Sequence, residues 1–129
     1  MKEPSSEVDE LAHQVIGAAI EVHRLLGAGF LESVYEQALA IEFLERGISF
    51  VRQAPIALEY KGQNVGEARL DFLVGGILVV ELKAVEAIHP IHQAQVINYL
   101  KATGHTLGLP INFNVLKLKD GGIKRIVST

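Results

Sequence analysis

The sequence predicts an α/β domain in which a mixed β-sheet is flanked by helices, in the order helix, helix, three strands, helix, strand, strand. Three observations predict this fold. Apolar residues recur at helical spacing before residue 47, they alternate with period two from residue 49, and a second helical segment follows the third strand. A chain of 129 residues can bury one core, so we expect residues 1–129 to form a single domain.

Two helices are expected in the first 47 residues. The first begins near Ser6, because Ser6 and Asp9 have the spacing of a capping box, and it ends at the glycines of segment 27–29. The second runs over residues 31–46, with Gly47 as its left-handed cap. Helical spacing predicts that the two buried faces consist of Leu11, Val15, Ala18, Val22 and Leu25, and of Val34, Ala38, Ile41 and Leu44.

Alternation predicts strands at residues 49–60, 65–74 and 77–84. Proline cannot donate to a ladder, so Pro55 makes the first strand an edge strand or places a bulge there. A third helix is expected from Pro90 to Gly104. Strands at 106–115, interrupted by Pro110, and at 123–127 complete the sheet. Short turns make the first three strands antiparallel, and the third helix allows a parallel crossover to the fourth.

Composition excludes several classes of site and location. The chain has no cysteine, which excludes disulfides and thiolate metal sites. It has neither a long apolar run nor an apolar signal core near its start, so we expect a cytoplasmic protein without membrane contact. Residues 1–60 carry ten acidic and four basic side chains, whereas residues 61–129 carry five acidic and eight basic ones. A positive half can present a patch to phosphate, although such an imbalance also arises by chance.

Three charged residues in two apolar strands are the clearest chemical signal. Glu81 and Lys83 lie on one face at the end of a buried strand, and Asp71 lies within the strand before it. Buried charges are costly unless they are paired or bind an ion. The alternative interpretation is a surface salt bridge at a strand end. A strict two-residue turn at Gly75-Gly76 would place the two carboxylates on opposite faces, so we predict a three-residue loop or a bulge that shifts the register by one.

These residue types suit the cleavage of a phosphodiester bond. Asp71 and Glu81 can hold Mg²⁺ or Mn²⁺, with the carbonyl of Leu82 as a further oxygen ligand. A bound metal lowers the pKa of water and neutralises developing charge. Lys83 can then orient or deprotonate the water and steady the phosphate.

Two further groups are candidates with equally simple structural explanations. His92, Gln95 and Tyr99 form one stripe of the third helix, which either contacts phosphate and fixes the lysine or is a solvated face. Glu32 at the start of the second helix either faces the metal or only complements the helix dipole. Tyr35 can belong to the core.

Several short motifs together resemble the GxxExxY protein family, which is assigned to the PD-(D/E)XK nuclease superfamily. They are Gly29-x-x-Glu32-x-x-Tyr35, Glu81-Leu82-Lys83, Gln95-x-x-x-Tyr99-Leu100, and Leu107-Gly108 leading to Ile111-Asn112-Phe113. The resemblance covers about residues 10 to 127 and implies a restriction endonuclease-like core. Leu70 stands where the superfamily's name has proline, and Pro110 stands where relatives usually have an apolar residue.

The resemblance implies a role for each matched position. Asp71 and Glu81 are expected to be metal ligands, Lys83 the catalytic lysine, and Gln95 and Tyr99 a supporting helix motif. Glu32 matches an acidic residue that the first core helix often supplies. We therefore expect a Mg²⁺- or Mn²⁺-dependent nuclease acting on DNA, or on RNA. A chain of 129 residues leaves little room for a separate DNA-reading domain, which favours a homodimer or a protein partner. The alternative is a catalytically inactive module that keeps the fold and binds nucleic acid or a protein.

Overall fold

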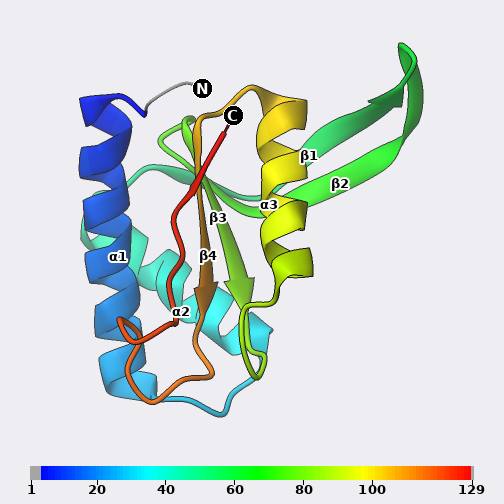
Figure 1. Cartoon of the computed structure of the whole chain (residues 1–129). Coiled ribbons are helices and arrows are strands. Elements are labelled where there is room, and N and C mark those ends of the chain that lie inside the picture. The colour runs from blue at the N-terminus through cyan, green and yellow to red at the C-terminus, as the bar shows by residue number, and fades with distance from the viewer. Residues whose placement is uncertain (1–3, 129) are drawn as a thin grey trace.

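The computed structural model describes residues 4–128 and has the predicted order of elements (Figure 1). Residues 4–128 contain three helices and five strands. The helices are α1 (Ser6–Leu26), α2 (Glu32–Glu45) and α3 (Pro90–Thr103), and the strands are β1 (Phe50–Tyr60), β2 (Gln63–Val74), β3 (Leu78–Lys83), β4 (Leu107–Asn112) and β5 (Ile126–Val127). This arrangement confirms the predicted mixed α/β fold.

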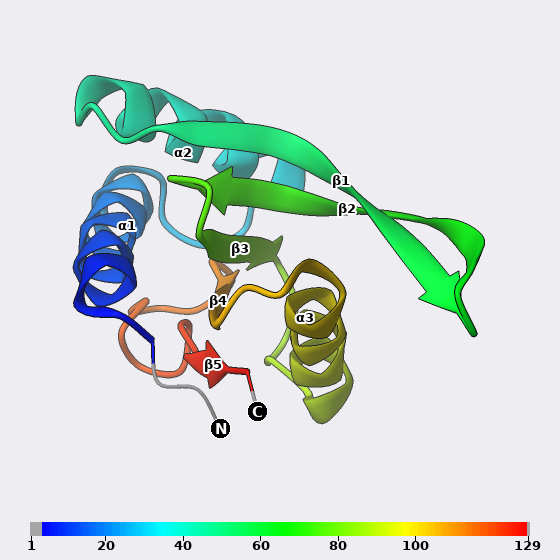
Figure 2. The same cartoon turned by 90° about the horizontal axis from the view of Figure 1, so that it is seen from above.

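The five strands form one sheet in the order β1-β2-β3-β4-β5. β1, β2 and β3 are antiparallel and β3 and β4 are parallel, as the connection lengths predicted, and β5 adds to β4 in the antiparallel direction. Helices α1 and α2 cover one face of the sheet and α3 covers the other (Figure 2). The larger part of the core lies under α1 and α2, while Val96 and Leu100 of α3 pack on the opposite face with Leu70 and Val79.

The first helix begins at Ser6, as predicted, but its cap lies one residue earlier than expected. Ser5, and not Ser6, is the N-cap, because its side chain accepts a hydrogen bond from the backbone N–H of Val8 at 3.2 Å. Most of the predicted face is buried or half-buried, but Leu25 is 66% exposed, so its inclusion was wrong. The backbone N–H of Gly27 closes the helix on the carbonyl of His23 at 2.8 Å.

The predicted buried face of α2 was wrong by about one residue. Its buried side chains are Tyr35, Leu39, Ala40 and Phe43, whereas Val34, Ile41 and Leu44 are exposed. The helix is apolar on more than one side, so spacing alone does not identify its inner face, and the two aromatic rings take the buried positions. The cap was correct: Gly47 has φ of +69°, and the N–H of Ile48 donates to the carbonyl of Phe43 at 2.9 Å.

The two strand prolines behave differently from each other. β1 is an edge strand, as Pro55 predicted, although its register shift lies at Leu58 and Glu59. Pro110 was expected to interrupt β4. It does not do so, because pairing with β3 continues through it to Asn112. The C-terminal segment pairs with β4 on both sides of the proline, at Gly108 with Ile126 and at Ile111 with Ile123. The N–H of Lys124 donates to the carbonyl of Pro110 at 3.1 Å, so the proline removes only the return hydrogen bond that its own N–H would have made. Both β4 and β5 are shorter than predicted.

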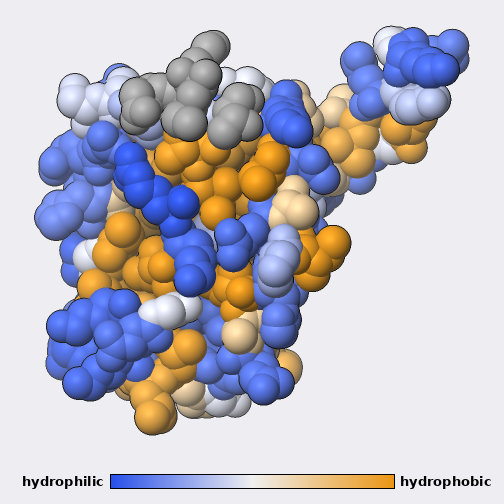
Figure 3. Space-filling view, in the orientation of Figure 1, coloured by the Kyte–Doolittle hydropathy of each residue, from blue (hydrophilic) through white to orange (hydrophobic). Residues whose placement is uncertain are grey.

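The hairpin of β1 and β2 forms an arm that extends beyond the body of the molecule (Figures 1 and 2). We use "arm" for residues 56–68, the outer part of this hairpin. All side chains from Glu59 to Glu67 are exposed, and the tip is hydrophilic in Figure 3. The inner part of the same hairpin belongs to the body of the sheet, and its strand β2 contains Asp71.

Gly108 lets α3 approach the sheet closely. A Cβ at this position would lie 2.5 Å from Cγ1 of Val96, a fully buried and stiff side chain of α3. We expect Gly108→Ala to lower the free energy of unfolding by about 1–3 kcal/mol, because the helix must move away from the strand. Urea unfolding followed by circular dichroism measures this change. Gly121→Ala cannot serve as a control, because the positive φ of Gly121 would itself strain an alanine, so wild type is the reference.

Candidate active site

The hairpin between β2 and β3 brings Asp71 and Glu81 together. Val74 pairs with Leu78, so the loop has three residues, and its two glycines adopt φ of +59° and +73°. Phe72 then pairs with Val80, which places Asp71 beside Glu81. This is the register that the prediction of a three-residue loop required, and the two carboxylates are neighbours instead of lying on opposite faces.

The two carboxylates take over the hydrogen bonds of the ladder where β2 and β3 separate. The N–H of Asp71 donates to Oε2 of Glu81 at 2.7 Å, and the N–H of Leu82 donates to Oδ2 of Asp71 at 2.8 Å. Each strand therefore supplies a carboxylate to the backbone of the other. Charged acceptors make such bonds short and strong, so both side chains have fixed positions.

Glu81 is held in an environment that disfavours its negative charge. The side chain is 5% exposed. Burial first, and then the neighbouring charge of Asp71, raise the pKa of Glu81 from 4.5 to about 8, against the hydrogen bond from the Asp71 backbone and the charge of Lys83. A cation placed between the two carboxylates would offset the charge of Asp71 and so favour the ionised form of Glu81, which stays buried.

Lys83 lies at the end of β3 and points toward α3. Its Nζ donates to Oε1 of Gln95 at 3.3 Å. A cavity of 560 Å³ opens at this point and is lined by Lys83, Gln95, Tyr99, His92, Asn98, Ile91 and Ala94, with Leu58 and Ala68 of the arm. The lysine and the stripe of α3 therefore face the same space, which agrees with one of the two interpretations that the sequence left open.

Tyr99 completes the α3 side of this cavity. Burial and the negative charge of Glu81 raise the pKa of Tyr99, while its contact with Gln95 lowers it. The phenol therefore keeps its proton and can donate a hydrogen bond. His92 has a different task, because its Nδ1 accepts a hydrogen bond from the N–H of His89 at the start of α3.

The structure does not bring Glu32 to the other acidic residues. Glu32 is exposed at the start of α2, where it complements the helix dipole. Among residues 4–128, no three or more histidine, cysteine, aspartate or glutamate side chains are grouped so that they could hold a metal ion. The candidate ligands thus reduce to Asp71, Glu81 and backbone oxygen.

Tyr35 of the Gly29–Tyr35 motif is a structural residue. Its ring is fully buried and stacks on Phe113 with centroids 4.5 Å apart. Its hydroxyl donates to the carbonyl of Gly27 at 2.6 Å and accepts from the N–H of Phe30 at 3.2 Å. These contacts fix the loop between α1 and α2.

Replacing Tyr35 with phenylalanine is therefore expected to cost about 1–3 kcal/mol of unfolding free energy, because two backbone groups lose their partner. Urea titration of the variant beside wild type tests this. No loss of stability would mean that water replaces the hydroxyl.

Asn112 is a site-supporting residue that sequence reasoning missed. It is fully buried and pairs in register with Lys83. Its Nδ2 donates to the carbonyl of Val85 at 2.9 Å, and its Oδ1 accepts from the N–H of Val85 at 3.1 Å. These bonds anchor the segment that leads from Lys83 to α3. The signal in the sequence is an asparagine inside an apolar run. Because α3 separates β3 from β4 along the chain, the sequence alone does not place this asparagine beside Lys83.

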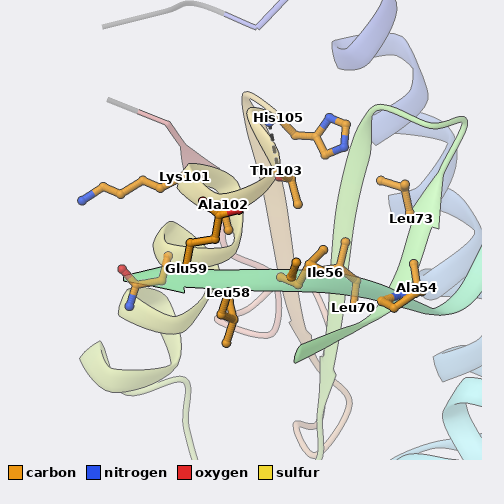
Figure 4. Close-up of a pocket in the computed structure, with 13 residues that line it drawn as sticks. Ala54, Ile56, Leu58, Glu59, Leu70, Leu73, Lys101, Ala102, Thr103 and His105 are labelled. Carbon is orange, nitrogen blue, oxygen red and sulfur yellow. Dashed lines mark hydrogen bonds between the residues drawn. The ribbon is translucent and has the colours of Figure 1, made fainter. Parts of the chain in front are cut away.

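A larger cavity adjoins the one beside Lys83, and the two share Leu58 and Asn98 as lining residues. It has a volume of 840 Å³ and lies between β1 and the second half of α3 (Figure 4). Ala54, Ile56 and Leu70 form its apolar wall, and Lys101 and His105 lie at its α3 side. None of the predicted site residues lines it, so volume alone does not identify the active site.

The donor set at the fork of β2 and β3 fits a hard divalent cation. Mg²⁺ prefers oxygen ligands and commonly binds through one or two carboxylates while it keeps several waters. Asp71 and Glu81 supply two neighbouring carboxyl groups, each oriented by a hydrogen bond from the backbone of the other strand. A lysine and a protonated phenol lie beside them. This arrangement can bind a cation and a phosphate together.

Comparison with known proteins agrees with the fold. The model of the PD-(D/E)XK nuclease superfamily matches residues 9–126. No curated protein matches the chain. A solved structure, an alkaline exonuclease from Laribacter hongkongensis, aligns over 100% of this chain and 73% of its own, with 16% identity and a TM-score of 0.41. Separately, none of the helices within residues 4–128 has the length and apolar character to cross a membrane.

Proposed function

Because the chain belongs to the PD-(D/E)XK nuclease superfamily, we propose that it is a metal-dependent nuclease that hydrolyses phosphodiester bonds of DNA. The observation that carries this proposal is the convergence of Asp71, Glu81 and Lys83 at the fork of β2 and β3. The two carboxylates come from different strands, and the three-residue loop between these strands sets the register in which they meet.

The metal, Mg²⁺ or Mn²⁺, would be held by Asp71, Glu81 and the carbonyl of Leu82. When bound, such an ion lowers the pKa of its water and offsets the charge that develops on phosphate. Glu32 has no part in this set, because it lies apart from the other carboxylates. The hydrogen bonds from the backbone keep Asp71 and Glu81 oriented before any ion arrives.

The cationic Nζ of Lys83 attracts the scissile phosphate and orients the attacking water. Gln95 accepts from this amine and so fixes the direction of the lysine side chain. Tyr99, which keeps its proton, donates a hydrogen bond to a phosphate oxygen within the cavity. These three side chains place one phosphate beside the carboxylates.

Cleavage of DNA by the wild type and its loss in Asp71→Asn test the proposal. Charge stabilisation by a metal is worth several kcal/mol, so we expect Asp71→Asn to lower the cleavage rate by about a hundredfold or more. Labelled single- and double-stranded DNA and RNA are incubated with Mn²⁺, and the products are separated on gels. Equal rates for both proteins would contradict the proposal and point to a contaminating nuclease.

One observation favours a catalytically inactive module as a second candidate. The carboxylates of Asp71 and Glu81 each accept a backbone N–H, so they also join two strands with no metal present. Calorimetric titration with Mn²⁺ separates the two functions. A nuclease binds the ion in wild type and loses binding in Asp71→Asn, whereas an inactive module shows no carboxylate-dependent heat.

A further inference from the structure

Gln53 has a backbone conformation that glutamine rarely adopts. Its φ is +50°, in the left-handed region, although it lies inside the edge strand β1. Within residues 4–128, the other non-glycine residue with positive φ is Lys61, which lies in the turn at the tip of the arm. A turn explains Lys61, but no turn explains Gln53. Strain of this kind persists only where the surrounding structure enforces it.

The unusual backbone directs the amide of Gln53 to the candidate metal ligand. Gln53 stands opposite Asp71 in the register of β1 and β2, between the pairs Arg52–Phe72 and Ala54–Leu70. Its Nε2 lies 3.4 Å from Oδ1 of Asp71 and 2.9 Å from Oε1 of Glu36 on α2. A single amide thus joins a helix on one side of the site to a carboxylate at its centre.

Two arginines hold this connection in place. Nη1 of Arg69 donates to the carbonyl of Gln53 at 3.1 Å and so supports the left-handed backbone. Nη2 and Nε of Arg52 donate to Oε2 of Glu36 at 2.7 and 3.2 Å. The pair of Arg52 and Glu36 is largely shielded, with side chains 33% and 18% exposed. One arginine therefore holds the backbone of Gln53, and the other holds Glu36, the acceptor of its side-chain amide.

We propose that Gln53 is a positioning residue that orients the carboxylate of Asp71 by tying it to Glu36. The inference deepens the proposed function, on which its consequence for metal binding rests. Oδ2 of Asp71 is held by the N–H of Leu82, and the Gln53 amide holds Oδ1, so the carboxylate is fixed at two points. One point alone leaves rotation about the bond to the carboxyl group.

The chemistry of the groups explains why an amide serves this purpose. Glu36 engages the guanidinium of Arg52, which keeps that positive charge away from Asp71. A cation in contact with Asp71 would compete with a metal ion for the same oxygen, whereas a neutral N–H donor does not. Residues that orient a metal ligand in this way typically change metal affinity by about 10–100-fold when they are replaced.

Two substitutions separate positioning from folding. Gln53→Asn keeps the amide and suits positive φ but is one methylene too short to reach both carboxylates. Gln53→Gly removes the side chain and relieves the backbone, so it should not destabilise the fold. Gln63→Asn makes the same chemical change on the arm, away from the site, and is the matched control.

The first measurement uses the metal-free protein. Three-bond couplings from the α- to the β-protons of Asp71, measured by NMR, report whether the side chain keeps one rotamer. We expect one rotamer in wild type and in Gln63→Asn, and averaging in both Gln53 variants. One unchanged rotamer in Gln53→Asn and Gln53→Gly, with melting temperatures as in wild type, would overturn the inference.

Calorimetry with Mn²⁺ supplies the second measurement. The Gln53 variants should bind Mn²⁺ about tenfold more weakly or worse, while Gln63→Asn binds as wild type does. Equal affinity in all four proteins contradicts the positioning role but leaves the proposed nuclease standing. Absence of Mn²⁺ binding in wild type contradicts the proposed nuclease instead, and the NMR couplings then decide whether Gln53 holds Asp71.

Discussion

Replacing Lys83 with alanine is expected to lower the rate of DNA cleavage by about 10²–10⁴-fold while Mn²⁺ still binds. The lysine contacts Gln95 and faces the cavity beside the carboxylates, so its loss removes a group that acts on water and phosphate. The carboxylates keep their own hydrogen bonds from the backbone. Cleavage rates at saturating Mn²⁺ and calorimetric titration of the same samples give the two quantities.

The matched control for this experiment is Lys61→Ala. Lys61 is an exposed lysine at the tip of the arm and lacks contact with the candidate site. The Lys61→Ala variant should cleave DNA at the wild-type rate. If Lys83→Ala cleaves as fast as Lys61→Ala, the lysine has no catalytic part. If it loses Mn²⁺ binding as well, the role of Lys83 is to hold the site together.

The stability of the metal-free protein is expected to fall as the pH rises from about 4.5 to about 8, through Glu81. Its pKa is raised from 4.5 to about 8, so between these values the folded state keeps a proton that the unfolded chain has released. The unfolding free energy then decreases by up to about 1.4 kcal/mol per pH unit. The contribution of Glu81 to the unfolding free energy is fully present below pH 4.5 and is lost above pH 8. The loss over this range totals a few kcal/mol.

Glu81→Gln should remove this pH dependence, because a neutral amide has no proton to lose. Urea unfolding with a chelator at pH 5 to 9 measures it, as the difference between wild type and variant, so that the histidines cancel. Glu86→Gln, at an exposed position nearby, should retain the wild-type slope. Parallel curves for wild type and Glu81→Gln would show that Glu81 is ionised throughout.

The order of elements and the proximity of Asp71, Glu81 and Lys83 could be predicted from the sequence. Both depend on local patterns: period, breakers and a carboxylate in an apolar strand. The register of β2 and β3 was also predictable, since chemistry required Asp71 and Glu81 to meet and two glycines made a three-residue loop easy. Their convergence in the structure confirms the geometric part of that argument.

The acidic residue of α2 could not be identified in the same way. Sequence reasoning chose Glu32, whereas the structure connects Glu36, one turn later, to Asp71 through Gln53. The choice depends on how the helix is rotated against the sheet, and the buried aromatic residues Tyr35 and Phe43 decide that rotation. Gln53 gave no signal, because a left-handed residue inside a strand leaves no trace in the hydrophobic pattern.

The arm gives one strand two very different levels of local stability. A two-stranded hairpin without further packing is only marginally stable in water, and the outer half of β2 has such surroundings. The inner half lies in the core beside β3. Backbone amides of β2 should therefore exchange with deuterium quickly near Val65 and slowly near Phe72, so that local opening of the arm does not extend along the strand to Asp71.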